Sequence, residues 1–216
     1  GPTGIGRAMS YDVDWEAMTD TLDKEFTICR MTQKNHTCCG HTFAAIDAVL
    51  ALKEAHGLTP DDVEAITVGT YAKGVEICGT PDPKTLYEAK FSLEYVMAAA
   101  LVTGRVRFAA FTDELLADPV MRANMAKIKC HVDDAAEAAF PSRRSAVVEI
   151  TTKDGQTLEH YSSTRKGDPD NPLSDAELED KYRELSEPVI GVDAAEALRQ
   201  RVWEIDKVDD LRTLFA

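Results

Sequence analysis

The spacing of apolar and polar positions divides much of the chain into helices and strands. Apolar residues recur at helical spacing over His41–His56, and Gly57 follows as a helix stop. Val63–Tyr71 is rich in β-branched residues and predicts a strand. Leu86–Thr103 carries apolar residues on two sides, which predicts a helix buried between layers and closed by Gly104.

Shorter signals complete the pattern. Thr27–Lys34 and Lys127–Val132 predict strands, and Phe111–Met125 predicts one or two short helices. Within Ser145–Thr164, two β-rich runs flank Asp154-Gly155, a pair typical of a two-residue hairpin loop. These elements form the order β-α-β-α-β, followed by a hairpin.

Two helices are predicted near the C-terminus. Ser174 and Glu177 have capping-box spacing before a helix that reaches about Leu185. Asp193 and Glu196 repeat that spacing before a helix ending near residue 203. The whole pattern predicts an α+β fold with helices on one face of a largely antiparallel sheet, and the apolar faces of the last two helices need a further surface.

Composition and charge narrow the class of protein. The chain has 216 residues and is 44% hydrophobic and 29% charged, which is typical of a soluble globular domain. Its net charge of −14 argues against nucleic acid and anionic membranes as partners. The five cysteines are odd in number and show no framework spacing, so we expect reduced thiols and a cytoplasmic location.

The segment Gln33–Val49 gathers several chemically versatile side chains just before the first strong helix. Its histidines and cysteines are His36, Cys38, Cys39 and His41. Their spacing, H-x-C-C-x-H, differs from the ligand pairs of structural zinc sites, and two adjacent cysteines rarely reach one ion. The spacing therefore predicts no metal site.

Two other interpretations of this segment stay open. Cys39 could be a nucleophile whose pKa is lowered by a helix N-terminus, or a buried thiol under the helix. A helix beginning near Gly40 would offer unpaired N–H groups to an anion. Lys34, His36 and His41 would then suit a carboxylate, whereas the simpler interpretation makes Lys34 a surface lysine.

Three histidine or tyrosine positions elsewhere carry weaker signals. Tyr95 lies on an apolar stripe, where a core tyrosine is common and a catalytic hydroxyl is the alternative. His131 and His160 are single histidines on expected strands, and we interpret both as structural.

Three motifs, in order along the chain, resemble the MmgE/PrpD family. They are K-N-H-T-C-C-G-H-T-F-A-A-I-D-A at 34–48, K-T-L-Y-E-A-K-F-S-L-E-Y-V at 84–96, and G-D-P-D-N-P-L-S with a following D-K-Y at 167–174 and 180–182. The family includes 2-methylcitrate dehydratase, cis-aconitate decarboxylase and iminodisuccinate epimerase. The resemblance covers the family's C-terminal half only.

The resemblance implies a particular domain organisation. Residues 1–26 would be a linker from an all-helical N-terminal domain, and residues 27–165 an α+β lid domain with a ferredoxin-like antiparallel sheet. Residues 166–216 would be a helical return segment that packs on the all-helical domain, which could also be a separate subunit. A homodimer is implied as well.

The resemblance also implies a chemistry that needs no metal or organic cofactor. A proton is removed next to a carboxylate of a small di- or tricarboxylate. Lys34 would bind and polarise a carboxylate, Tyr95 would donate a proton or anchor a carboxylate, and Cys39 would occupy a position that is histidine in the decarboxylases. His36 and His41 would bind substrate.

Two departures from the family bear on the reaction. Cys39 and Phe43 stand where many relatives carry histidine, which weighs against a plain decarboxylase. The expected enzyme is a hydro-lyase similar to 2-methylcitrate dehydratase. An epimerase or a decarboxylase of the same family is the first alternative, and a non-catalytic binding or assembly module is the second.

Overall fold

The computed structural model describes residues 4–17 and 19–213, and its contacts divide the chain between residues 32 and 33. The first unit holds the short helix α1 (Ile5–Met9) and the 3₁₀ helix η1 (Thr27–Arg30), with mostly exposed side chains. The strand predicted for Thr27–Lys34 is therefore wrong. In the described part of the chain no strand pairs with this segment to supply ladder hydrogen bonds. The predicted three-part domain organisation stays a prediction.

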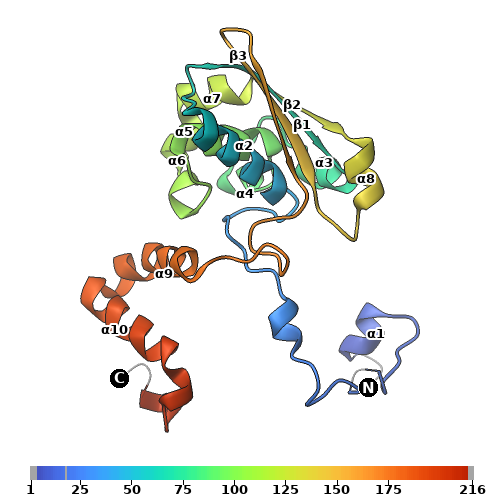
Figure 1. The fold of residues 1–216 in the computed structure, drawn as a ribbon, viewed down its shortest axis with the longest axis vertical. Coiled ribbons are helices and arrows are strands. Elements are labelled where there is room, and N and C mark those ends of the chain that lie inside the picture. Colours follow the sequence, from blue (N-terminus) through green and yellow to red (C-terminus); the bar gives the residue numbers. More distant parts are fainter. Residues whose placement is uncertain (1–3, 18, 214–216) are drawn as a thin grey trace. The chain divides into compact units, whose positions relative to one another are not determined.

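The second unit is built on a four-stranded sheet (Figure 1). Its strands are β1 (Val63–Thr70), β2 (Ile128–Val132), β3 (Ala146–Thr152) and β4 (Thr157–Ser162), in the order β2-β1-β3-β4. The pairs β1–β3 and β3–β4 are antiparallel, but β1 and β2 are parallel. The sheet is thus mixed, which corrects the predicted antiparallel sheet, because a long helical connection returns the chain to the same end before β2. The ferredoxin-like detail stays a prediction.

That connection consists of short helices around one long helix. The elements are α3 (Ala72–Cys78), α4 (Leu86–Ala89), α5 (Leu93–Thr103), η2 (Phe108–Ala110), α6 (Asp113–Ala117) and α7 (Pro119–Met125). The single helix predicted over 86–103 is split, because the Ser92 side chain accepts a hydrogen bond from the Tyr95 N–H and starts α5 anew. The sequence pattern did not predict α3.

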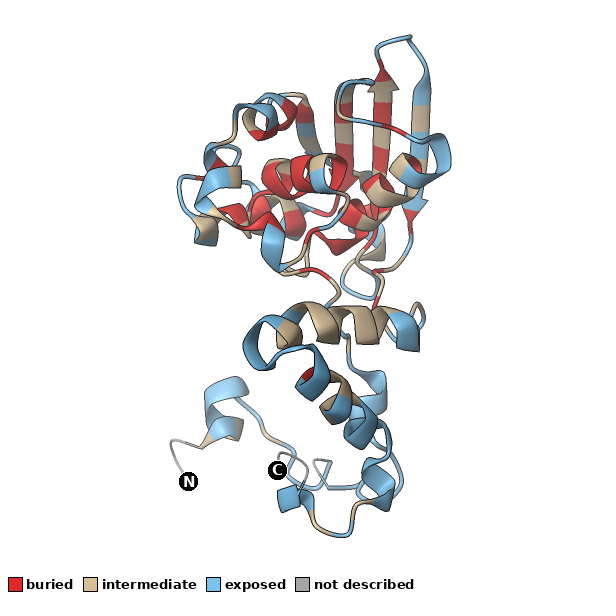
Figure 2. Ribbon diagram, turned by 90° about the vertical axis from the view of Figure 1, so that its left-hand side faces the viewer, coloured by how far each residue is buried: buried red, intermediate tan, exposed pale blue. Residues whose placement is uncertain are grey.

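The core lies between one face of the sheet and the helices α2 (Phe43–His56) and α5. α2 packs against β3 and β4 and ends at Gly57, whose φ of 63° closes the helix as predicted. α5 packs against α2, α7 and β2, and almost all of its side chains are buried (Figure 2). The expectation of a helix buried between layers is confirmed.

The helix α8 (Asp134–Ala139) and the hairpin of β3 and β4 complete the sheet. α8 connects β2 to β3 and packs on β1. The Thr152 N–H bonds the Gln156 carbonyl, and the Gly155 N–H bonds the Thr152 carbonyl. The loop therefore has three residues instead of the predicted two, with Gly155 at φ 87°.

The C-terminal helices are α9 (Asp175–Ile190) and α10 (Val192–Trp203), followed by η3 (Ile205–Lys207) and η4 (Leu211–Thr213). The capping box of Ser174 and Glu177 is confirmed. The second capping box does not form, because α9 runs on to Ile190 and α10 starts directly after Gly191. Most side chains of α9 and α10 stay at least partly exposed (Figure 2). No helix in the described part of the chain is long and apolar enough to cross a membrane.

Gly167 fixes the segment that leads into the first motif, and its replacement has a predictable cost. Gly167 has φ 99°, its carbonyl accepts from the Gln33 N–H at 2.8 Å, and an added Cβ would lie 2.0 Å from the Gln33 carbonyl oxygen. We expect Gly167→Ala to lower the free energy of unfolding by more than ~2 kcal/mol. Gly155→Ala is the matched control, because Gly155 has positive φ but open space. We expect it to cost ~1 kcal/mol. Equal losses in chemical denaturation would contradict the clash.

Candidate active site

A cavity of about 440 Å³ opens between the first motif and the junction of α4 and α5. It is lined by Lys34, His36, Thr37, Cys38, Cys39, Gly40, Lys90 and Phe91. The Cys39 N–H donates to the Lys90 carbonyl at 2.9 Å, and the Thr37 N–H donates to the Val106 carbonyl at 3.0 Å. These backbone bonds bring two lysines from distant parts of the sequence to one cavity.

Both lysines lack a carboxylate partner among the described residues. The Lys34 ammonium is exposed and makes only a long contact, 3.4 Å, with the Cys38 carbonyl. The Lys90 ammonium lies 5.6 Å from the centroid of the Phe111 ring. Across residues 4–17 and 19–213, neither lysine forms an ion pair. The cavity is therefore a local cationic site on an acidic chain, which suits a carboxylate.

Cys39 is a half-buried thiol of the cavity, and its pKa is lowered. A hydrogen bond from the Cys78 thiol, the N–H of His41 and the charges of Lys34 and Arg144 together lower the pKa of Cys39 to about 6, against the opposing effect of burial. The same shared hydrogen bond, with burial, raises the pKa of Cys78. At neutral pH, Cys39 is therefore the thiolate and Cys78 the thiol that donates to it.

The neighbouring Cys38 differs from Cys39 in its burial and in the direction of its pKa shift. Its side chain is buried, lies 3.3 Å from the Thr42 hydroxyl, and has its pKa raised to about 12, mainly by burial. The two interpretations from the sequence both concern Cys39, and its lowered pKa favours the nucleophile, which stays a prediction. Cys38 is a buried thiol under the helix.

The thiolate gives a pH-dependent prediction. Because the pKa of Cys39 is lowered to about 6, its alkylation by iodoacetamide should rise with pH through a midpoint near 6 and be nearly maximal at pH 7. Cys78→Ala removes the hydrogen bond and should move that midpoint upward. Mass spectrometry of the modified peptide measures both, with exposed Cys29 as the internal reference. A Cys39 midpoint unchanged by Cys78→Ala would contradict the assignment.

The buried His36 side chain is held in place by Asp47 and Phe43. It is 4% exposed, its Nε2 lies 2.9 Å from Asp47 Oδ1, and its ring packs edge-on against Phe43 with centroids 5.1 Å apart. The second oxygen of Asp47 accepts from the Lys166 N–H at 2.8 Å. His36 therefore lines the cavity while tying the first motif to the loop after β4, and its binding role stays a prediction.

His41 points to a different partner. Its Nδ1 lies 2.7 Å from the Tyr71 hydroxyl, and Tyr71 stacks on Phe140. Burial and then the charge of Arg144, with other cations, lower the pKa of His41, so the ring is neutral at pH 7. Burial raises the pKa of Tyr71. The His41 side chain does not line the cavity, although its backbone N–H helps to stabilise the Cys39 thiolate.

The start of α2 does not form the predicted anion site. The helix begins at Phe43, two residues later than expected, and its first residues, Phe43–Ala45, are buried. The Thr42 hydroxyl is also buried and donates to the Cys39 carbonyl at 2.8 Å. The cations at the cavity are lysine side chains, and the helix N–H groups do not reach it.

Tyr95 lies outside the cavity lining. Its side chain is fully buried, its hydroxyl donates to the Ala110 carbonyl at 2.7 Å, and its ring lies near that of Phe111. Burial raises the pKa of Tyr95. This geometry favours a core tyrosine, and a catalytic role for Tyr95 stays a prediction.

Sequence reasoning missed four residues of the site. Lys90 stands inside the second family motif, so its place there was the available signal. Tyr71, Cys78 and Arg144 lie in no motif, and only the fold brings them near Cys39 and His41. Among the described residues, no group of three or more His, Cys, Asp or Glu side chains is arranged to hold a metal ion.

The fold and the cavity define an α+β domain with two lysines and a thiol of lowered pKa at one cavity. Comparison with known families then places it. The model of the MmgE/PrpD C-terminal domain matches residues 36–207, so the chain belongs to the MmgE/PrpD family.

Individual relatives share this relationship at low identity. The chain is 27% identical to cis-aconitate decarboxylase of Mus musculus over 175 residues, which is 78% of this chain and 35% of that protein. It is 26% identical to a cis-aconitate decarboxylase-like protein, oryM, of Aspergillus oryzae over 99% of this chain and 45% of that protein. It is 29% identical to the mitochondrial 2-methylcitrate dehydratase of Yarrowia lipolytica over 55% of this chain and 24% of that protein. The chain thus spans less than half the length of these relatives.

Proposed function

We propose that the protein is a lyase of the MmgE/PrpD type whose cavity binds a small di- or tricarboxylate. The observation that carries this proposal is the meeting of two unpaired lysines, Lys34 and Lys90, with the low-pKa thiol of Cys39 at one cavity. Lysines without partners can hold substrate carboxylates, and a thiolate can take a proton. The lyase names of the relatives support the same class.

The first candidate reaction is a dehydration similar to that of 2-methylcitrate dehydratase. The Cys39 thiolate would take a proton from the carbon next to a carboxylate, and the electron pair would form the double bond as hydroxide leaves with a proton, so that water is the second product. Lys34 would stabilise the negative charge that develops on the carboxylate. The proton donor would belong to the all-helical domain that the family resemblance implies.

Decarboxylation is the second candidate, because a decarboxylase aligns with more of this chain than the dehydratase does. The same cationic cavity would stabilise the carbanion left when carbon dioxide departs. Epimerisation, in which the carbanion is protonated on its other face, is the third. We further propose a cofactor-independent, cytoplasmic homodimer.

A substrate panel tests these proposals. The full-length protein is assayed with 2-methylcitrate, citrate, cis-aconitate and iminodisuccinate, and the products are identified by NMR. Loss of water, loss of carbon dioxide or inversion separates the three reactions. If the intact protein binds one of these compounds but converts none of them, the enzyme proposal fails. The alternative of a non-catalytic binding or assembly module would then be favoured.

A further inference from the structure

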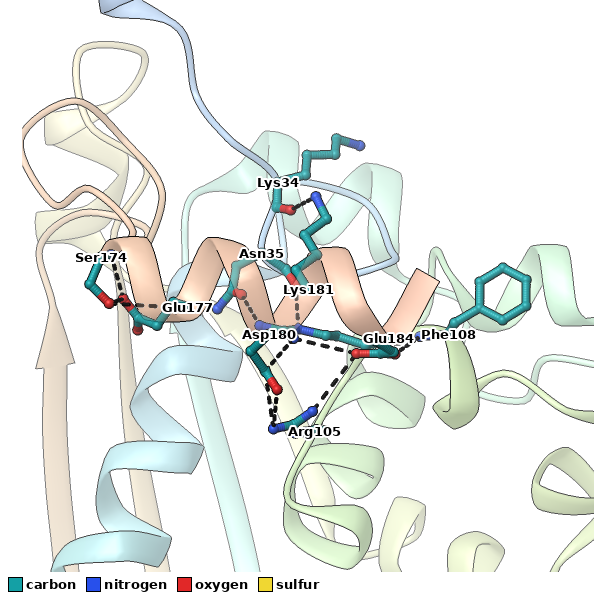
Figure 3. Close-up of polar contacts among 10 residues, drawn as sticks. Lys34, Asn35, Arg105, Phe108, Ser174, Glu177, Asp180, Lys181 and Glu184 are labelled. Atoms are coloured by element: carbon teal, nitrogen blue, oxygen red, sulfur yellow. Dashed lines mark hydrogen bonds and ion pairs between the residues drawn. The ribbon is translucent and has the colours of Figure 1, made fainter. Parts of the chain in front are cut away.

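The segment that carries Lys34 has no regular secondary structure, yet it is fixed at several backbone atoms. The Lys34 carbonyl accepts from the Lys181 ammonium at 2.5 Å, and the Asn35 carbonyl accepts from Arg107 Nε at 3.3 Å. Figure 3 shows the Lys34 side chain pointing away from these contacts while its carbonyl faces Lys181. Side chains from other elements therefore satisfy backbone carbonyls that neighbouring strands would satisfy in a sheet.

Arg107 is the centre of this arrangement. Its Nη2 donates to Asn35 Oδ1 at 2.9 Å, so one guanidinium holds both the backbone and the side chain of Asn35. Its Nη1 pairs with Asp180 at 2.7 Å and contacts Glu184 at 3.4 Å, and both of these carboxylates belong to α9. The Arg107 side chain is only 11% exposed, so these contacts are sheltered from solvent.

We propose that Arg107 is the positioning residue for Lys34, and that it couples the site segment to helix α9. The planar guanidinium is what makes this possible, because it directs its N–H groups at Asn35 and at the α9 carboxylates simultaneously. A lysine at this position would keep the positive charge, but its ammonium cannot direct N–H groups at both partners in a fixed plane. The proposal rests on the proposed function, in which the Lys34 ammonium contacts a substrate carboxylate.

Arg105 provides a natural control on the same loop. It pairs with Asp180 at 3.1 Å and with Glu184 at 3.8 Å, the same carboxylates that Arg107 contacts, but its side chain is 58% exposed. It has no hydrogen bond to Asn35 in the described part of the chain. Arg105→Lys therefore makes the same replacement of a guanidinium that contacts α9, without touching the segment that carries Lys34.

The first experiment follows the segment directly, without any assay of activity. The N–H groups of Gln33 and Thr37 bond the carbonyls of Gly167 and Val106. In the full-length protein, Arg107→Lys should speed hydrogen exchange of these two amides by at least ~10-fold, while Arg105→Lys changes it less than ~2-fold. Unchanged exchange in Arg107→Lys would overturn the positioning role, whatever the enzyme's reaction.

The second experiment asks whether that positioning acts through Lys34. Arg107→Lys should lower kcat/KM about 10-fold for the substrate that the panel identifies, and the same change should have less than a ~2-fold effect when Lys34 is already alanine. Asn35→Ala, which removes one acceptor of Arg107 and leaves its bonds to α9, should reproduce part of the loss. Thermal unfolding of each variant confirms that the fold is intact.

The outcomes separate the two proposals. Absence of turnover in the substrate panel would overturn the proposed function, and a normal Lys34→Ala variant would overturn the role that this function gives to Lys34. An impaired Lys34→Ala variant combined with fully additive effects of Arg107→Lys would overturn the positioning role alone, because independent residues contribute additively.

Discussion

Replacement of Lys34 by alanine should lower kcat/KM for the substrate that the panel identifies by ~10²-fold or more, because it removes the electrostatic stabiliser of the proposed reaction. The physical reason is that Lys34 contributes a full charge at the cavity that no carboxylate of the described chain neutralises. Steady-state kinetics of the full-length variant, with citrate, 2-methylcitrate, cis-aconitate and iminodisuccinate, measure the loss.

Lys84→Ala is the matched control for Lys34→Ala. Lys84 is exposed, pairs with Asp82 and does not line the cavity. Lys84→Ala removes the same charge and should leave kcat/KM within ~2-fold of the parent protein, because exposed ion pairs contribute little. A Lys34→Ala variant that also stays within this range would disprove the proposed role of Lys34.

Replacement of Phe43 by alanine should lower the free energy of unfolding by about 3–5 kcal/mol, the cost of removing a large aromatic side chain from a core. Phe43 is the first residue of α2, is fully buried, and packs edge-on against His36. The cavity left behind would therefore lie directly beneath the first motif.

Chemical denaturation followed by circular dichroism measures this loss. Phe108→Ala is the matched control, because Phe108 is 66% exposed and should cost less than ~0.5 kcal/mol. Similar losses in the two variants would show that Phe43 is not part of a close-packed core.

The elements that the sequence predicted well are those whose burial repeats at regular spacing. α2 ends at Gly57 and α5 ends at Gly104, both with positive φ, because local stop signals and local periodicity agree there. The parallel pairing of β1 with β2 could not be predicted, because it depends on the path of the intervening helices. The same is true of the break at Ser92, where a local side-chain cap overrides a continuous apolar stripe.

The candidate site was predictable only in part, for a similar reason. The first motif gathers Lys34, His36 and Cys39 by adjacency, and the structure places all three at one cavity. Periodicity placed Tyr95 correctly on a buried stripe, but the pattern could not show that its hydroxyl bonds Ala110. Cys78 reaches Cys39 only through the fold, and no spacing rule links the two.

The bond between the Lys34 carbonyl and Lys181 has a consequence for the order of folding. The two residues are 147 positions apart in the sequence, and Lys181 lies on α9, which follows all four strands of the sheet along the chain. A chain made from its N-terminus therefore completes the sheet before this bond can form. During synthesis the sheet and its helices can assemble first. The segment that carries Lys34 acquires its final position only after α9 has emerged, so the chain gains a folded core before it gains a competent site.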